Sequence, residues 1–220
     1  MKKIIFWFII IVGIVALIGS CAKKDDTTAA TAAVDNTTST TSYISTTTTA
    51  SGSITMGDDT LSGVYASECL TSASTIAFFV ASGFWASEVN AYGQVFVVTG
   101  SDNISIELYA FTDTSCSNLS LSQKTVSDNV TFGSASGSNY PVTYNNQTQA
   151  LTVHTTAAET ALETLYSNAL DFIVGTPIEL PVSGSGLRYG LWTLSGTTWY
   201  EASSSSATPT SAGTVPHVKQ

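Results

Sequence analysis

The sequence has few charged residues and therefore little of the chemistry that such residues carry out. Only 10% of the 220 residues are Asp, Glu, Lys or Arg, two are histidine, and the single arginine is Arg188. Acidic residues outnumber basic ones 16 to 7, which gives a net charge of −9. A chain with this balance repels a phosphate backbone, so we expect no nucleic-acid partner. Solubility must depend on Ser, Thr and Asn instead.

Long hydrophobic runs are lacking except at the N-terminus. Lys2 and Lys3 precede an unbroken apolar run from Ile4 to Ile18, which ends in small residues. That layout is typical of a secretory signal peptide. The run is shorter than the ~20 residues that cross a bilayer comfortably, so a permanent membrane helix is the weaker alternative.

The end of this run, "IGSC" (residues 18–21), resembles the bacterial lipobox. The resemblance implies that residues 1–20 are removed as a lipoprotein signal peptide and that Cys21 carries acyl chains such as palmitate. Two or more acyl chains anchor a protein stably to a membrane. In bacterial lipoproteins, Asp directly after the lipidated cysteine favours retention in the inner membrane. Ala22 stands at that position here, so the resemblance implies the outer membrane, on its periplasmic face or at the cell surface. Without Lys2 and Lys3 the net charge would be −11.

Two cysteines remain once Cys21 is lipidated, and they most simply form a disulfide. Cys69 and Cys116 are an even pair in an oxidising compartment. Free thiols or a metal site are the alternatives, but a structural zinc needs four ligands and only His154 and His217 are available. We therefore predict no metal and no cofactor.

Composition divides the chain into four parts. After the signal peptide, residues 21–60 are rich in Thr, Ser and Ala and poor in large apolar residues, which predicts a disordered tether. Residues 61–215 have the size of one β-rich domain, and residues 216–220 are expected to be a C-terminal tail.

Alternation of apolar and polar residues predicts a mainly β domain. In "ISIELYAF" (residues 104–111), Ile104, Ile106 and Leu108 share one face of a strand. One segment has helical spacing instead, with Thr156 and Glu159 placed as a capping box, and it predicts one helix near 157–170. The expected fold is a single antiparallel β-barrel or a β-sandwich. Candidate strands are 63–69, 75–81, 86–99, 103–112, 117–132, 140–145, 149–155, 187–194 and 198–203, with a hairpin turn at 195–197.

Two cysteine motifs carry a family resemblance. "GVYASEC" (residues 63–69) and "FTDTSC" (residues 111–116) together resemble small bacterial lipoproteins with a disulfide-bonded β domain, and the Gly-x-aromatic start is distantly similar to lipocalins. Lipocalins are barrels that hold small apolar ligands. The resemblance implies a cation-π pair between Tyr65 and Arg188. A solvated Arg188 is the alternative.

Motifs of catalysis are missing. "GSASG" (residues 133–137) has Ala135 where a nucleophile elbow needs serine, and "GSGLRYG" (residues 184–190) does not match a dinucleotide loop. His154 follows the alternation of a strand and reads as a half-exposed strand residue rather than a general base. We expect no catalytic residues and no enzyme.

The sequence therefore predicts a non-enzymatic, lipid-anchored envelope lipoprotein with a structural or interaction role, whose partner would be an envelope protein. The alternative is a lipocalin-like carrier of a small apolar ligand. Aromatic residues between Phe78 and Phe96 would form the core, line a cavity, or make an exposed patch.

Overall fold

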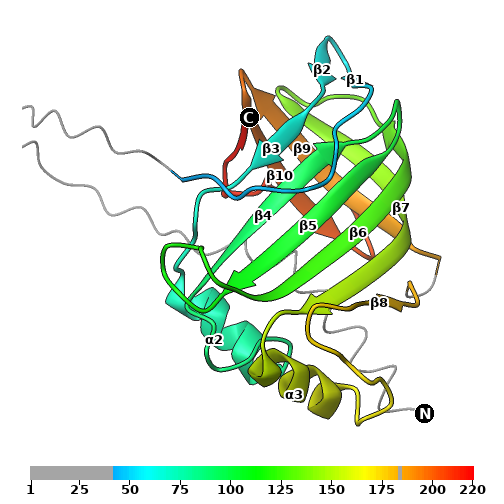
Figure 1. Cartoon of the computed structure of the whole chain (residues 1–220). Coiled ribbons are helices and arrows are strands. Elements are labelled where there is room, and N and C mark those ends of the chain that lie inside the picture. Colours follow the sequence, from blue (N-terminus) through cyan, green and yellow to red (C-terminus); the bar gives the residue numbers. More distant parts are fainter. Residues whose placement is uncertain (1–41, 183–184) are drawn as a thin grey trace, which may run out of the picture.

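The fold is a closed barrel of eight antiparallel strands (Figure 1). The structure, a computed structural model, describes residues 42–182 and 185–220. The barrel alternative of the predicted fold class is confirmed. In ring order the strands are β3 (Val64–Ala66), β4 (Ala91–Val98), β5 (Ile104–Phe111), β6 (Leu119–Phe132), β7 (Asn139–Val153), β9 (Leu187–Ser195), β10 (Thr198–Ser204) and β11 (His217–Lys219), which returns to β3.

Strand β7 has two neighbours on the same edge. Its first half, residues 139–145, pairs with β9, and its second half, residues 149–152, pairs with β8 (Pro177–Leu180). The other edge of β7 pairs with β6 and contains register shifts. The barrel wall therefore changes partner partway along β7.

Two helices lie at one end of the barrel (Figure 1). Helix α3 (Thr156–Leu165) is the predicted helix, and its N-cap is Thr155, whose side chain accepts a hydrogen bond from the Ala158 backbone at 3.1 Å, one residue before the predicted cap. Helix α2 (Ala73–Ala81) replaces the predicted strand at 75–81, which was wrong. It begins after Ser72 and buries Phe79 in the core.

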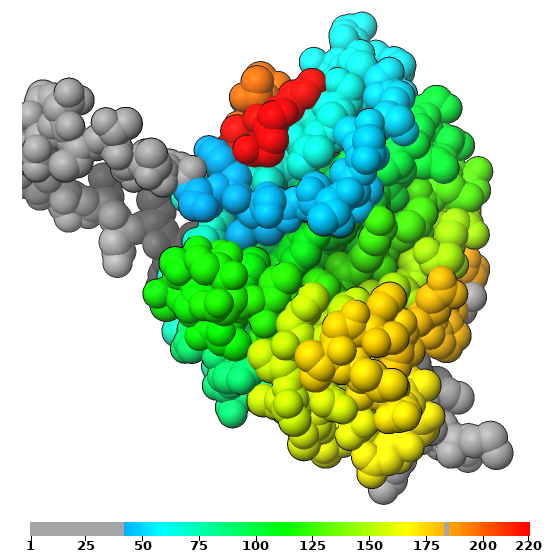
Figure 2. All heavy atoms as spheres, in the orientation of Figure 1, coloured from blue at the N-terminus to red at the C-terminus, as the bar shows by residue number. Residues whose placement is uncertain are grey.

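Residues 42–53 form an N-terminal strap across the outer wall of the barrel (Figure 2, blue). The Ile44 backbone donates to the Ser67 carbonyl at 3.1 Å, and the Ile44 side chain packs where a Cβ on Gly93 would come within 2.2 Å of it. Only glycine leaves room for this close approach.

The predicted tether is therefore wrong for residues 42–60, because its side chains find specific partners on the barrel. After the strap, β1 (Ile54–Met56) and β2 (Asp59–Leu61) form a hairpin that buries Ile54, Met56 and Leu61 in the end of the barrel opposite the helices. The signal peptide and Cys21 lie outside the described residues.

The predicted C-terminal tail, residues 216–220, is also corrected. It contains β11, which pairs with β10 on one side and β3 on the other. His217, expected outside the folded domain, is 1% exposed and packs edge-on against Phe96 with ring centroids 4.7 Å apart. This short strand closes the barrel.

The interior of the barrel has two apolar layers. Near the β1–β2 hairpin, Tyr65, Trp192 and Trp199 form the centre of one cluster, with the two indole rings 4.6 Å apart. At the helical end, Phe79 stacks on Trp85 with ring centroids 4.2 Å apart. The inward side chains between these layers are largely polar, and the candidate site lies there.

In the part of the chain that the structure describes, none of the helices has the length and hydropathy needed to span a bilayer.

Candidate functional site

A cavity of ≈ 90 Å³ lies between the two apolar clusters. Strands β4, β5, β6, β7, β9 and β10 line its wall, and residues of the α2 region contribute two phenyl rings. Its apolar lining is Phe79, Phe84, Ile106 and Leu108, and its polar lining is Gln94, Gln123, Thr125, Tyr144, Asn146, Gln149, Arg188, Glu201, Ser203 and Ser204.

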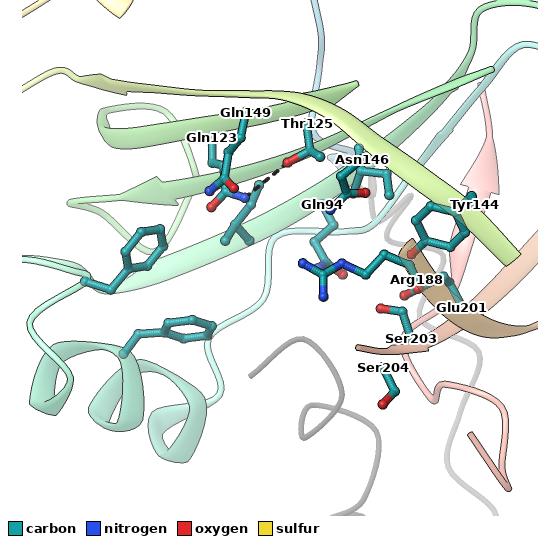
Figure 3. Close-up of a pocket in the computed structure, with 14 residues that line it drawn as sticks. Gln94, Gln123, Thr125, Tyr144, Asn146, Gln149, Arg188, Glu201, Ser203 and Ser204 are labelled. Atoms are coloured by element: carbon teal, nitrogen blue, oxygen red, sulfur yellow. Dashed lines mark hydrogen bonds between the residues drawn. The ribbon is translucent and has the colours of Figure 1, made fainter. Parts of the chain in front are cut away.

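Arg188 places a cation inside the barrel. It stands on β9 directly across from Tyr144 of β7, and its guanidinium reaches into the cavity (Figure 3). Burial lowers its pKa, an effect that Tyr144 partly opposes. Within residues 42–182 and 185–220 the guanidinium has no hydrogen bond and no ion pair. Its five N–H donors are thus available to a bound molecule.

Glu201 brings a carboxyl group to the same cavity from β10. Its Oε1 atom is buried and has no hydrogen-bond partner among the described residues. Burial raises the pKa of this carboxyl to about 7, and the Ser203 side chain opposes part of the shift. The carboxyl and the guanidinium of Arg188 share the cavity without forming an ion pair.

Amide and hydroxyl groups complete the polar wall. The Gln123 side chain donates to Thr125 at 3.3 Å, and Asn146 accepts a bond from Ser127 at 2.9 Å. Gln94 and Gln149 add two further terminal amides. An amide offers both donors and acceptors, so this wall can bind either kind of polar group.

His217 lies behind this wall. One ring nitrogen, Nδ1, is 3.3 Å from the Trp199 carbonyl, and Nε2 is 3.4 Å from the end of the Gln94 side chain. Both partner atoms, the Trp199 carbonyl oxygen and Gln94 Oε1, can only accept, so a neutral ring with one N–H donates to one of the two. Burial lowers the pKa of His217 to about 4, and the bond to Trp199 partly offsets that effect. The ring is therefore neutral at pH 7.

The structure does not bring Tyr65 and Arg188 together as the predicted cation-π pair. Tyr65 meets the edge of Trp199, with ring centroids 5.4 Å apart, in the cluster near the β1–β2 hairpin. Arg188 lies beside Tyr144. Two strands, β11 and β10, separate β3 from β9 in the ring, so the barrel provides Arg188 with a different aromatic neighbour.

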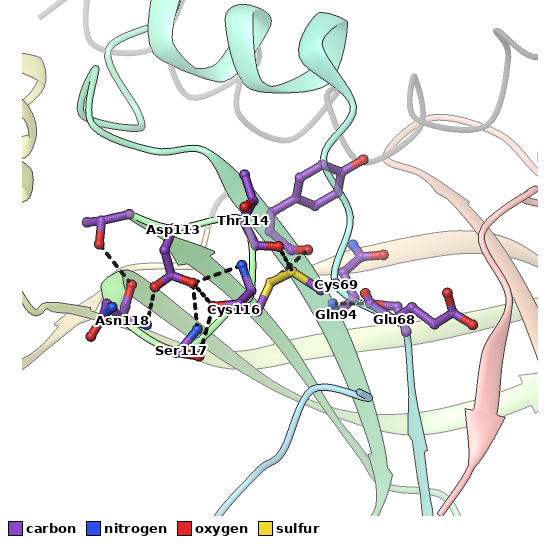
Figure 4. The surroundings of a disulfide bond; sticks show 12 residues. Glu68, Cys69, Gln94, Asp113, Thr114, Cys116, Ser117 and Asn118 are labelled. Carbon is purple, nitrogen blue, oxygen red and sulfur yellow. Dashed lines mark hydrogen bonds between the residues drawn. A yellow bond between two sulfur atoms is a disulfide. The ribbon is translucent and has the colours of Figure 1, made fainter. Parts of the chain in front are cut away.

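The predicted pairing of Cys69 with Cys116 is confirmed. The two residues form a disulfide with Cα atoms 5.8 Å apart (Figure 4). It links the β3–α2 connection to the β5–β6 connection, and Cys116 Sγ lies 4.0 Å from the Tyr92 carbonyl of the intervening strand β4. Asp113 stabilises the turn that contains Cys116 by accepting bonds from the backbone of Ser117 at 3.1 Å and Asn118 at 2.7 Å.

A groove of ≈ 400 Å³ runs outside the barrel, between the N-terminal strap and β5, β6 and β7. Its most buried charge is Glu107, 2% exposed, which accepts bonds from Thr46 and Thr48 of the strap and from Tyr109. Lys124 Nζ lies 4.0 Å from the same carboxylate. Because its oxygens are already bonded, Glu107 holds the strap to the wall.

His154 lies in this groove, half-buried, just after β7. Its Nε2 is 3.0 Å from the Ser122 hydroxyl, and burial lowers its pKa. No carboxylate of the described residues bonds its other ring nitrogen. The pair therefore lacks the acid that orients histidine in a catalytic triad.

Sequence reasoning missed most of the cavity because it assigns polar residues of a strand to the outside. Gln94, Thr125 and Glu201 point inward at the middle of their strands. Arg188 was the one available signal, as the single arginine in the chain.

A scan against protein-family models finds no match to the chain, and a search of curated proteins finds no significant match either.

Proposed function

We propose that this chain is a non-enzymatic, lipid-anchored envelope lipoprotein whose barrel binds a small polar molecule in its interior. Acyl chains on Cys21 would hold it at the outer membrane, on the periplasmic face or at the cell surface. The lipobox resemblance of residues 18–21 supports the anchor, and the cavity supports the binding role.

The observation that carries the binding role is a pair of polar side chains inside the barrel that have unsatisfied atoms, the Arg188 guanidinium and Glu201 Oε1. Arg188 has no hydrogen bond to the described residues, and Glu201 Oε1 is buried without one. A buried polar group left unsatisfied costs about 1–3 kcal/mol. Apolar side chains at these two positions would stabilise the barrel better than Arg188 and Glu201 do. A ligand that supplies the missing hydrogen bonds explains why polar side chains are present there.

The chemistry of the lining favours a polar ligand over the apolar one that the lipocalin resemblance implies. Ten of the fourteen lining residues carry a hydroxyl, amide, carboxyl or guanidinium group. A purely hydrocarbon ligand would cover these groups without bonding them, at a cost in affinity. A cavity of ≈ 90 Å³ has room for only a few non-hydrogen atoms, so the ligand, or the part of it that enters the barrel, must be small.

We expect Thr125→Leu to fill the cavity and abolish ligand binding. Thr125 lines the cavity and is 5% exposed, whereas Thr131 is exposed on the same strand and provides a matched control as Thr131→Leu. The full chain, extracted in mild detergent, would be examined by native mass spectrometry. The wild type and Thr131→Leu should retain a small polar mass that Thr125→Leu lacks. A wild-type protein at its apo mass would contradict the proposal, as would the same adduct on Thr125→Leu.

An interaction role is a second candidate, and an exposed apolar set at the helical end favours it. Phe78 is 41% exposed, Ile173 56% and Val174 43%, and Phe78 and Ile173 directly adjoin Phe79 and Phe172 of the buried cluster there. A photo-crosslinking residue at position 173 should then give one discrete adduct with an envelope protein, absent from the exposed position 179 of β8. Equal labelling at both positions would argue against a specific surface.

A further inference from the structure

The cavity contains one permanent positive charge and one carboxyl group that can change charge. Arg188 and Glu201 both line it, and neither is neutralised by the other through an ion pair. The other groups that line it are amides, hydroxyls, the Tyr144 phenol and apolar side chains. The charge of the site therefore depends on the proton of Glu201.

We propose that the cavity selects a small carboxylate, which pairs with Arg188, and that Glu201 takes up a proton as the carboxylate binds. This inference rests on the proposed function and adds to it the class of ligand and a coupling to protons. The reaction is balanced, since one carboxylate and one proton enter the cavity together and the net charge of the site is unchanged.

The shape of the guanidinium favours a carboxylate. Its planar fork of N–H donors matches the two oxygens of a carboxylate, and these charge-assisted bonds are among the strongest in proteins. A dianion such as phosphate would bring a second negative charge to a site with one cation and a buried carboxyl, so a single charge fits better. The rings of Phe79 and Phe84, with Leu108, provide an apolar surface for a short hydrocarbon group.

The position of Glu201 explains the proton uptake. A carboxylate bound to Arg188 would place a second negative charge in the same ≈ 90 Å³ space, and like charges in a buried site cannot both persist. The carboxyl of Glu201 already has a pKa raised to about 7 by burial, so protonation is accessible near neutral pH.

Few other titratable groups face Glu201. Tyr144 on β7 has a pKa raised by burial and by the charge of Glu201 itself, so its phenol stays neutral. Arg188 on β9 stays charged. His217 on β11 is neutral and faces Gln94 and Trp199. The pH dependence of binding around pH 7 should therefore follow Glu201 alone.

The test uses propionate and its neutral isostere propionamide as probes. The full chain in detergent micelles, with ¹⁵N-labelled tryptophan, would be titrated at pH 6 and pH 8. The readout is the indole signal of Trp192, whose ring lies 5.8 Å from that of Tyr144. Dispersed indole signals of Trp85 and Trp199 before ligand is added report an intact fold in each variant. We expect propionate to bind about tenfold more weakly at pH 8 than at pH 6, and propionamide at least tenfold more weakly than propionate at pH 6.

Three variants separate the contributions. Glu201→Gln mimics the protonated carboxyl, so its affinity for propionate should be the same at both pH values and exceed that of the wild type at pH 8. Glu179→Gln, an exposed acid on β8, should keep the wild-type pH dependence. Arg188→Gln should remove the preference for propionate over propionamide.

The outcomes distinguish the inference from the proposed function. Equal affinity for the two probes, or equal affinity for propionate at both pH values, would overturn the carboxylate inference while leaving a polar binding site. If neither probe shifts the Trp192 signal at either pH, the binding function fails together with the inference.

Discussion

Replacing Cys69 and Cys116 together by serine is expected to lower the free energy of unfolding by about 4 kcal/mol. The disulfide closes a loop with a sequence separation of 47, and in the chain-entropy model a cross-link of this span removes that much disorder from the unfolded chain. The loop contains α2, β4 and β5, so the cross-link restrains two barrel strands and one helix at once. The loss would exceed a third of the stability of most domains.

The measurement is urea unfolding of the purified wild type and the double serine variant, followed by tryptophan fluorescence. Wild type reduced with dithiothreitol is the matched control and should unfold at the same urea concentration as the variant. Substituting both cysteines avoids a free thiol that could form disulfides between chains. A variant that unfolds at the concentration of the oxidised wild type would refute the stabilising role of the bond.

The second large effect is a destabilisation by acid that depends on His217. Its folded-state pKa of about 4 lies below the ordinary value of 6.5, so between these values the unfolded chain binds more protons than the folded one. Stability from this group is complete above pH 6.5 and declines as the pH falls toward 4. At pH 4 the loss should reach about 3 kcal/mol relative to pH 7.5.

Glu201 works in the opposite direction over nearly the same range. Its folded pKa of about 7 lies above the ordinary 4.5, so its contribution is greatest below pH 4.5 and is lost as the pH rises through 7. In a plot of wild-type unfolding free energy against pH, the two contributions would largely cancel. The comparison must therefore be made between variants.

His217→Gln retains a side chain that can donate to Trp199 and bond Gln94. Relative to the wild type it should gain about 3 kcal/mol in unfolding free energy between pH 7.5 and pH 4, measured by urea titration. His154→Gln is the control, because that ring is half-exposed and its substitution should change the difference much less. Parallel profiles of His217→Gln and wild type would show that the buried ring is not the acid-sensitive group.

The strands of the barrel were largely predictable because their outer and inner faces differ. In β5, Ile104 and Ile106 belong to the interior cluster, and Glu107 faces outward as the alternation predicts. The hairpin turn at residues 195–197 was also correct, since β9 ends at Ser195 and β10 begins at Thr198. Turn residues and period-two patterns are local signals that survive folding.

Helix α2 could not be read from its sequence because "ASTIAFFVA" is apolar on nearly every side and rich in residues that favour strands. Its helical form depends on the Ser72 cap and on the packing of Phe79 against Trp85, a contact that exists only in the folded barrel. The strap and β11 were missed for a related reason. Thr46 and Thr48 are ordered by the Glu107 carboxylate, about sixty positions away. Strand β11 is ordered by β10, which precedes it closely, and by β3, which is distant in the sequence.

The pairing of β11 with β3 sets the time at which the barrel can form. Lys219 is matched with Tyr65, so the seam joins β11 to the first barrel strand, which lies far from it in the sequence. Because a chain is made and exported from its N-terminal end, β3 and β10 remain open edges until residues 217–219 can join them. Such edges can pair with other chains. Barrel closure is thus a late, long-range step, and deleting residues 217–219 would leave two permanent edges on an otherwise complete sheet.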